Sequence, residues 1–323
     1  MRIFHPVNYT LLVTVGAAAA FLLLEAARLF FHQRRLHAIP VRIHTNGSRG
    51  KSSVTRLVGA VMRASGKVTV TKTTGTAARF ILPDGHEVPI FRPGKPNITE
   101  QIKVVRKAHE LGAEVLIAEC MAVTPEYIHI LQSKTIQGTL GIFTNVRDDH
   151  LDVMGPTIYD ATVNMSKSMP HNGHVITAEP IWFPVLEQEA KKRGSTITQV
   201  SGQSVTDDEM SGFDYIEHKD NVAIALEVAS HYGVPRQTAL EAMYRANPDP
   251  GALREIIVKP SPQSGRAGPQ RRPQEAERTP TDPAAPPLQP VSPLEYLSPR
   301  FPKQAKFVRI GSIFLKPGIR QLT

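Results

Sequence analysis

The chain has 323 residues, of which 41% are hydrophobic, so it is long enough to bury a sizeable core in one large or two modest domains. Its net charge of +9 is unevenly distributed, because residues 259–323 contain 11 Lys and Arg against 4 Asp and Glu, and residues 1–258 carry only +2. The nearly neutral main part gives no reason to expect nucleic-acid binding. Cys120 is the only cysteine, which excludes an intrachain disulfide and agrees with a reducing compartment.

An apolar stretch without charges runs through residues 9–24, near the N-terminus. Glu25 and Arg28 follow it, and apolar residues resume up to Phe31, before the basic pair Arg34-Arg35. Because a membrane-spanning helix needs about 20 apolar residues, the stretch is long enough only if it continues to Phe31. We predict an uncleaved single-pass membrane anchor through residues 9–31, with the Arg34-Arg35 side in the cytoplasm. A cleaved signal peptide or a soluble helix is the alternative.

Residues 41–53, with the sequence VRIHTNGSRGKSS, predict a β-branched strand, a glycine-bearing turn and the start of a helix. Gly47 and Gly50 have no Cβ, so backbone N–H groups can close around an anion, and the positive end of the helix points at the same place. We expect Lys51 to reach the β- and γ-phosphates of ATP and Ser52 to bind Mg²⁺. A glycine-rich turn without function is the simple alternative, because Thr45 stands where the longer P-loop pattern has glycine.

A second strand is predicted at residues 67–71, and the segment KTTGTAAR at 72–79 follows it. This segment supplies hydroxyl groups, a glycine and two cations, although a simple polar turn would have the same composition. Asn97 is then a helix N-cap candidate, with Glu100 as its capping-box partner. The apolar stripe predicted for this helix consists of Ile98, Ile102, Val105 and Ala108.

Two apolar runs end in polar residues, as buried parallel strands do. The run VLIA at 115–118 ends at Glu119, and the run at 138–143 ends at Thr144-Asn145. In an open parallel sheet, the carboxyl ends of the strands line the crevice in which ligands bind. The alternation of strands and helices therefore predicts an α/β fold with a doubly wound, mostly parallel sheet.

Residues 148–152, with the sequence DDHLD, come directly after this run. Carboxylates and an imidazole so close together suggest an oxygen-rich Mg²⁺ site with a histidine ligand, or a solvated acidic loop. The position just past a strand end favours the metal site. A helix is expected next, at about 157–169.

The composition changes near residue 254. Between Pro260 and Pro302 lie 12 of the 27 prolines, with Ser, Gln, Arg and Ala between them, which predicts a disordered Pro-rich tail. We therefore divide the chain into an anchor at 1–35, an ATP-binding domain at 36–253 and a tail at 254–323. A shifted reading frame in the gene, or a truncation, would also explain the sudden change.

Three motifs in this order resemble the Mur ligase superfamily of ATP-dependent amide ligases. They are NGSRGKS at 46–52, KTTGTAAR at 72–79 and TNVRDDHLDVMGPT at 144–157, with support from RPGK at 92–95 and ECMA at 119–122. Within the superfamily they look most like the catalytic subunits of poly-γ-glutamate synthases, the capsule-biosynthesis ligases of bacteria. The similarity covers roughly residues 1–253, including the N-terminal anchor.

The resemblance implies ATP and Mg²⁺ as cofactors and assigns roles to individual residues. Those implied to bind the nucleotide are Asn46, Gly47, Ser48, Arg49, Gly50, Lys51, Ser52, Ser53, Asn145 and Asn221. Those implied to serve catalysis are Lys51, Glu119 and His150, with Ser52 and Glu119 holding one Mg²⁺ and His150 a second. Thr73, Thr74 and Arg79 are expected to contact the substrate.

The implied reaction is the polymerisation of glutamate through an acyl phosphate, with release of ADP. The implied partners are the growing poly-γ-glutamate chain and other membrane subunits of the synthase, but no nucleic acid. The implied location is the cell membrane, with the catalytic domain in the cytoplasm. One alternative is a nucleotide-binding partner without turnover in the same assembly, and another is a soluble ligase that makes a peptidoglycan or folate-type γ-glutamyl bond.

Overall fold

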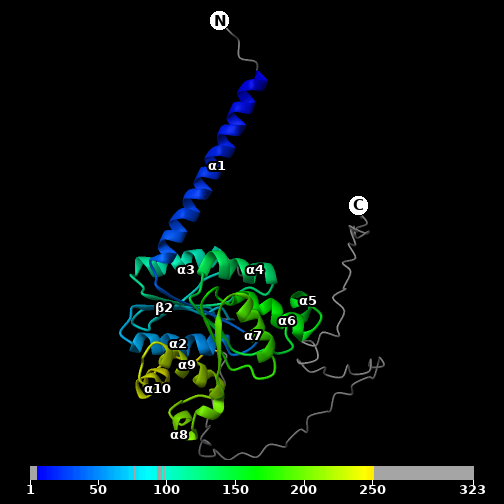
Figure 1. Cartoon of the computed structure of the whole chain (residues 1–323). Helices are drawn as coiled ribbons and strands as arrows, with labels where there is room; N and C mark the ends of the chain where they lie inside the picture. The colour runs from blue at the N-terminus through cyan, green and yellow to red at the C-terminus, as the bar shows by residue number, and fades with distance from the viewer. Residues whose placement is uncertain (1–5, 76, 93–96, 98, 251–323) are drawn as a thin grey trace, which may run out of the picture.

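The structure is a computed structural model that describes residues 6–75, 77–92, 97 and 99–250 (Figure 1). The predicted tail at 254–323 lies outside the described residues. Within them the strands are β1 (Val41–Asn46), β2 (Thr69–Lys72), β3 (Arg79–Ile81), β4 (Glu87–Pro89), β5 (Val115–Glu119), β6 (Leu140–Phe143), β7 (His174–Thr177) and β8 (Thr196–Gln199). The α-helices are α1 (Pro6–His37), α2 (Lys51–Ala64), α3 (Thr99–Glu110), α4 (Pro125–Ile130), α5 (Leu151–Met154), α6 (Ile158–Met165), α7 (Phe183–Lys192), α8 (Asp207–Met210), α9 (Lys219–His231) and α10 (Arg236–Tyr244). Short π- and 3₁₀-helical segments are η1 (Leu131–Ile136), η2 (Ser166–Ser168) and η3 (Gly202–Ser204).

One eight-stranded sheet forms the centre of the domain, with the strand order β4-β3-β2-β5-β1-β6-β7-β8. The strands from β2 to β8 in this order are parallel, and the β3–β4 hairpin adds two antiparallel strands at one edge. The predicted mostly parallel α/β sheet is therefore confirmed. Because β1 lies between β5 and β6, the segments that follow these three strands meet at one edge of the sheet.

Helices cover both faces of the sheet (Figure 1). On one face α2, α9 and α10 pack around a core that includes Val58, Ile117 and Ile224. On the other face α3, α4, α6 and α7 pack over residues such as Leu116 and Phe143. Leu116 and Ile117 are neighbours in β5 and point to opposite faces, which is why this strand is apolar along its whole length.

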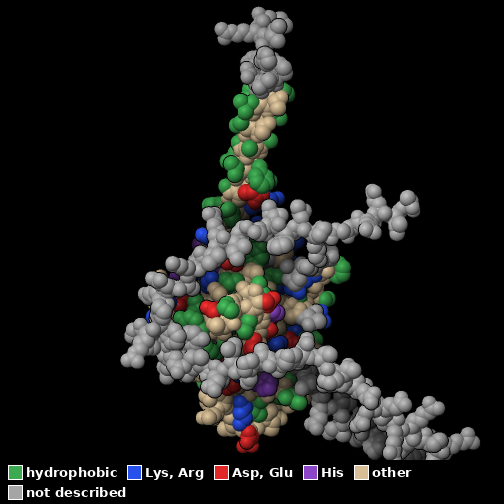
Figure 2. Space-filling view, turned by 90° about the vertical axis from the view of Figure 1, so that its right-hand side faces the viewer, with side chains coloured by type: hydrophobic (Ala, Val, Ile, Leu, Met, Phe, Trp, Pro, Cys, Tyr) green, Lys and Arg blue, Asp and Glu red, His purple; other side chains and the backbone are tan. Residues whose placement is uncertain are grey.

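Helix α1 projects from the face that α3 and α4 cover (Figure 1). Figure 2 shows hydrophobic side chains along it, with charged side chains gathered where it meets the domain. Among the described residues, the stretch Tyr9–His37 is the one helical segment long and apolar enough to cross a membrane, and an 18-residue window within it has a mean hydropathy of 2.0. Its last turns belong to the domain, because Leu36 is fully buried and His32 Nε2 lies 3.1 Å from the carbonyl oxygen of Thr135.

Three local expectations need correction. Glu100 does not complete a capping box with Asn97, because its carboxylate binds Lys72 and Arg92 instead, although Asn97 Oδ1 does accept a hydrogen bond from the Thr99 N–H at 2.9 Å. In the predicted stripe of α3, Val105 and Ala108 are buried, but Ile102 is 41% exposed. Ile98 lies outside the described residues. The helix expected at 157–169 also ends early, since α6 gives way to η2 after Met165.

Candidate active site

A cavity of about 620 Å³ lies at the carboxyl ends of β1, β2, β5 and β6, where ligands bind in open parallel sheets. Its size is in the range usual for small-molecule sites. The glycine-bearing turn of residues 46–53 forms one wall, and the segments after the neighbouring strands form the others. Lys51, Glu119 and His150 all line this cavity, so the structure brings the three predicted catalytic residues to one place.

Gly47 and Gly50 are required at their positions in the turn. Both have positive φ angles, +132° and +80°, that other residues rarely adopt. A Cβ on Gly47 would lie 2.1 Å from Oγ1 of Thr144, and a Cβ on Gly50 would lie 2.8 Å from Oδ1 of Asn221. The turn is therefore shaped by its own backbone and by close contacts from two other segments.

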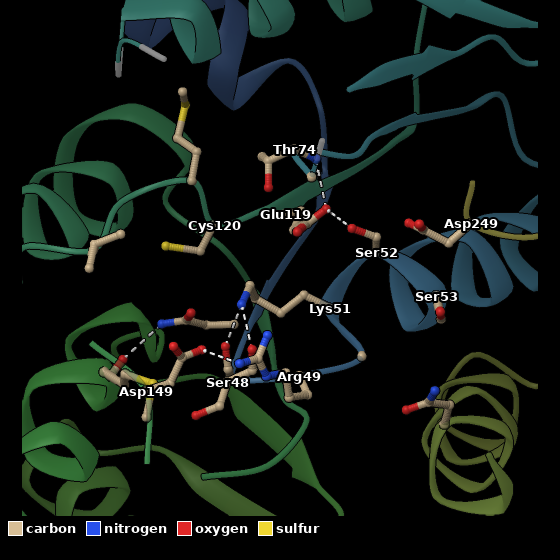
Figure 3. A pocket seen from close by; sticks show the side chains of 18 of the residues that line it. Ser48, Arg49, Lys51, Ser52, Ser53, Thr74, Glu119, Cys120, Asp149 and Asp249 are labelled. Atoms are coloured by element: carbon tan, nitrogen blue, oxygen red, sulfur yellow. Dashed lines mark hydrogen bonds and ion pairs between the residues drawn. The ribbon is translucent and has the colours of Figure 1, made fainter. Parts of the chain in front are cut away.

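Lys51 opens α2 and folds back over the turn (Figure 3). Its ammonium group donates hydrogen bonds to the carbonyl oxygens of Gly47 at 2.7 Å and Ser48 at 3.0 Å. The positive charge of this side chain thus lies beside the N-terminus of α2, where the helix dipole and free N–H groups also favour an anion. This arrangement suits a phosphate group.

Asn145 holds the turn from the segment that follows β6. Its Oδ1 accepts a hydrogen bond from the Arg49 N–H at 3.1 Å, and its Nδ2 donates to the Arg49 carbonyl oxygen, also at 3.1 Å. Thr144 Oγ1 donates to the same carbonyl oxygen at 2.7 Å, and the Ser48 N–H donates to the Asn145 carbonyl oxygen at 2.9 Å. Asn145 therefore positions the glycine-bearing turn, and a direct contact with a nucleotide stays a prediction.

Glu119 ends β5 and is only 2% exposed. Its Oε2 accepts hydrogen bonds from the Ser52 hydroxyl at 2.9 Å and from the Thr74 N–H at 2.7 Å (Figure 3). In an octahedral Mg²⁺ site with Mg–O distances of 2.0–2.1 Å, neighbouring ligand oxygens lie about 2.9 Å apart. The hydroxyl and the carboxylate therefore already have the spacing of two adjacent Mg²⁺ ligands.

His150 belongs to a separate polar cluster in the same cavity. Its Nε2 lies 3.6 Å from Asp149 Oδ1, and Asp149 Oδ2 lies 3.5 Å from Arg49 Nη2. The His150 backbone has a left-handed φ of 55°, and its side chain is 55% exposed. The part of the chain that the structure describes contains no group of three or more His, Cys, Asp or Glu arranged to hold a metal ion. A metal at His150 therefore stays a prediction.

Two of the residues predicted to contact the nucleotide, Asn46 and Asn221, form hydrogen bonds with other protein groups. Asn46 is 3% exposed, and its Nδ2 donates to Ser168 Oγ at 3.1 Å and to the Met165 carbonyl oxygen at 3.2 Å. Asn221 Nδ2 donates to Glu217 Oε1 at 2.7 Å. Both asparagines still line the cavity, together with Ser48, Arg49 and Ser53.

The three predicted substrate residues have different positions. Thr74 lines the cavity. Thr73 is 1% exposed. It forms two hydrogen bonds with Arg79: the Arg79 N–H donates to Thr73 Oγ1 at 3.1 Å, and the Thr73 N–H donates to the Arg79 carbonyl oxygen at 3.0 Å. Thr73 and Arg79 thus close the base of the loop that carries Thr74.

A buried ion-pair network supports this loop and was not anticipated as part of the site. Lys72 is fully buried, and Arg92 binds both carboxylate oxygens of Glu100, with N–O distances of 2.7 and 2.9 Å. Arg92 Nη1 also donates to the Thr74 carbonyl oxygen at 3.2 Å. Burial disfavours the charged form of Glu100, but the hydrogen bonds from Arg92 and Lys72 outweigh it and lower the pKa of this carboxyl to about 2. The sequence indicates these two residues only in that Lys72 begins the motif KTTGTAAR and Arg92 begins the motif RPGK.

Comparison with known proteins matches residues 46–240 to the Mur ligase middle domain. The capsule biosynthesis protein CapB of Bacillus anthracis is 43% identical over 225 residues, which cover 69% of this chain and 48% of that protein. The PGA synthase CapB of Bacillus subtilis strain 168 is 40% identical over 248 residues, which cover 76% and 63%. The chain thus spans about half of the first relative and less than two thirds of the second. Among solved structures, E. coli FolC in complex with DHPP and ADP has a TM-score of 0.50 at 17% identity, covering 72% of this chain and 63% of that one.

Proposed function

The chain belongs to the Mur ligase family, and we propose that it is the membrane-anchored, ATP-binding part of a ligase that polymerises glutamate into poly-γ-glutamate. The relatives named for capsule biosynthesis and PGA synthesis support this substrate class. The observation that carries the proposal is the contact between Ser52 and Glu119 beside the phosphate-binding turn, in a cavity large enough for a nucleotide and an acceptor.

In this proposal ATP binds with its phosphates at the turn. The backbone N–H groups of residues 47–52 and the Lys51 ammonium would stabilise the negative charge of the β- and γ-phosphates. Asn145 would keep the turn in its binding shape through the two hydrogen bonds to Arg49. FolC, a protein of similar fold, holds ADP, which is consistent with this use of the fold.

Ser52 and Glu119 would hold Mg²⁺, and His150 is the proposed ligand of a second ion. Bound Mg²⁺ neutralises charge on the phosphates as a carboxylate approaches. Glu119 suits this role because burial and the Thr74 N–H fix its carboxylate in place before any ligand arrives. Preorganisation of this kind lowers the cost of binding the ion.

The proposed chemistry has two steps. A glutamate-chain carboxylate oxygen attacks the γ-phosphorus of ATP, so the bond from that phosphorus to the β–γ bridging oxygen breaks and ADP leaves with an acyl phosphate formed. The amine of the next glutamate then attacks the acyl carbon, phosphate leaves, and the amine nitrogen loses a proton as the amide forms. Such phosphoryl transfer needs positioning and cations rather than a covalent protein nucleophile, in agreement with a cavity built around Lys51 and Glu119.

We also propose that α1 crosses the cell membrane once, with the domain in the cytoplasm, where ATP is available. The length and apolar character of the helix support the span, and the Arg34-Arg35 pair at its domain end supports the orientation. A capsule polymer made at the membrane would require other membrane subunits as partners. The growing poly-γ-glutamate chain is the proposed substrate.

The test is glutamate-dependent release of ADP by the full chain in membranes. Lys51→Ala should abolish the release while circular dichroism shows an unchanged fold, and Lys191→Ala, which removes an exposed lysine of α7, should leave it unchanged. ATP binding by the wild-type chain without glutamate-dependent ADP release would refute the ligase and favour a nucleotide-binding partner without turnover.

A further inference from the structure

We propose that the surface formed by α3 and α4 binds the anionic lipid headgroups of the same membrane that α1 crosses. We call this surface the α3–α4 face, and we define it by the exposed residues Ile102, Lys103, Arg106, Lys107, Tyr127 and Ile130. The inference depends on the proposed membrane span and goes beyond it, because a spanning helix can anchor a domain that makes no contact of its own with the lipid.

The first support is the rigid connection between α1 and the domain. Helix α1 continues without interruption to His37, and Gln33 Nε2 donates to the Lys134 carbonyl oxygen at 2.9 Å, directly beyond α4. Leu36 and Ile39 are fully buried in the same hydrophobic cluster as Val105 of α3. The membrane-spanning helix and the α3–α4 face therefore belong to one packed unit.

The second support is distance along α1. The shortest span, of about 20 residues from Tyr9, ends at about Arg28, and the predicted span ends at Phe31. His32, which is buried in the domain, therefore lies at most four residues beyond the span. At a rise of 1.5 Å per residue this is about 6 Å. The headgroup region on each side of a bilayer is itself about 5–7 Å thick. The α3–α4 face, from which α1 projects, must then lie at the headgroups (Figure 1).

The third support is charge. Around the base of α1, the exposed or half-exposed basic side chains are Arg28, Arg34, Arg35, Lys103, Arg106, Lys107 and Lys134, and the exposed or half-exposed carboxylates there are Glu25, Glu110 and Glu126. This surplus of basic groups is complementary to an anionic leaflet. Arg106 and Lys107 share the single carboxylate of Glu110. On the opposite side of the sheet, Lys219 and Arg236 each have a carboxylate of their own, Asp207 and Glu209 respectively.

The fourth support is the apolar part of the α3–α4 face. Ile102, Tyr127 and Ile130 are 41%, 52% and 37% exposed, although their helices bury other apolar residues against the sheet. Tyrosine and aliphatic side chains among basic residues are typical of surfaces that rest at the membrane interface. The exposure of Ile102, unexpected from the helix periodicity, is explained by such a contact.

The experiment places a fluorophore on each side of the sheet. Cys120 is the only cysteine and is buried, so Ile102→Cys or Gln237→Cys can be labelled with bimane in the otherwise native full chain. Each labelled protein is reconstituted in nanodiscs of phosphatidylcholine with or without phosphatidylglycerol, with a quencher on the lipid headgroups. We expect strong quenching at position 102 with phosphatidylglycerol, and much weaker quenching at position 237 on α10.

Two changes should weaken the quenching at position 102. Raising the salt to about 1 M shortens the Debye length to about 3 Å and should reduce it. Lys103→Glu/Lys107→Glu should reduce it too, whereas Lys219→Glu/Arg236→Glu, which makes the same charge change on the opposite side, should not. Equal quenching at 102 in both lipid compositions, unaffected by the first pair of substitutions, overturns the α3–α4 face while leaving the span intact. A chain that does not remain with the nanodiscs overturns both.

Discussion

Lys72 is fully buried, and its ammonium nitrogen lies 2.7 Å from Oε1 of Glu100. Lys72 belongs to the sheet, whereas Glu100 belongs to a helix that covers it. The contact joins the end of β2 to α3, next to the loop whose Thr74 N–H binds Glu119. Since Arg92 binds the same carboxylate and also the Thr74 carbonyl oxygen, the shape of the cavity wall depends on this one carboxylate.

Replacing Glu100 should therefore destabilise the protein strongly. Glu100→Gln removes the carboxylate that is paired with the buried Lys72 charge, and we expect a loss of about 3 kcal/mol in the free energy of unfolding, the usual effect of breaking a buried ion pair. Glu110→Gln, on the same helix, removes a carboxylate that pairs with Arg106 and Lys107 at the surface and should cost less than about 0.5 kcal/mol. Urea denaturation of both variants measures the difference, and similar losses would contradict the prediction.

The lowered pKa of Glu100 predicts that the stability of the protein depends on pH. The pKa of Glu100 is about 2 in the folded protein, below its ordinary value of 4.5, so the unfolded chain takes up the proton first on acidification. Its contribution is fully present above pH 4.5 and is lost as the pH falls from 4.5 towards 2. The free energy of unfolding should fall less steeply over this window in Glu100→Gln than in the wild type. Parallel pH profiles for the two proteins would rule out the assigned shift.

A comparison of two glycines separates the effect of backbone strain from that of steric contact in the glycine-bearing turn. Gly50 and Gly66 have nearly equal φ angles of +80° and +81°, but a Cβ on Gly50 would press on Asn221, whereas a Cβ on Gly66 meets nothing within 4 Å. Gly66→Ala should cost about 1 kcal/mol and leave ATP affinity unchanged. Gly50→Ala should show the same strain and also lose ATP binding, measured by calorimetry. Equal ATP affinities in both variants would contradict the close fit at Gly50.

Glu119→Gln should have opposite effects with and without Mg²⁺. The substitution keeps the shape of the side chain but removes the charge that a cation requires, so we expect ATP affinity in Mg²⁺ to fall by on the order of 100-fold. In EDTA the variant should bind ATP at least as well as the wild type, because a negative charge beside the phosphates is gone. Glu126→Gln, at an exposed site on α4, is the control and should change neither affinity. A uniform loss in both buffers would mean that Glu119 supports the fold rather than the metal.

The sequence was sufficient to predict the centre of the site. Residues 41–53 form the expected strand, turn and helix start because the signals are local: β-branched residues, two glycines and the apolar spacing that follows. The position of Glu119 at the cavity also follows from a short buried strand with a polar end. These features depend on neighbours along the chain, which a sequence pattern records.

Contacts between distant segments could not be predicted in this way. Glu100 has the position of a capping-box residue, but its carboxylate binds Lys72 and Arg92, because buried cations offer a stronger partner than a backbone N–H. Asn145 reaches Arg49 only because β6 lies beside β1. The pattern of residues within each strand does not indicate which strands are neighbours in the sheet. The exposure of Ile102 likewise depends on which sides of α3 the rest of the domain covers.

Because α1 runs into the core as one helix, the domain is expected to move with it as a rigid body. Leu36 is packed inside, and α1 is helical without interruption from Leu36 back to the apolar turns above it. A bilayer thinner than the apolar length of the helix makes such a helix tilt, through hydrophobic mismatch. With α1 spanning the membrane as proposed, the whole domain would then lean by the same angle, so lipid thickness would set the direction in which the mouth of the cavity opens.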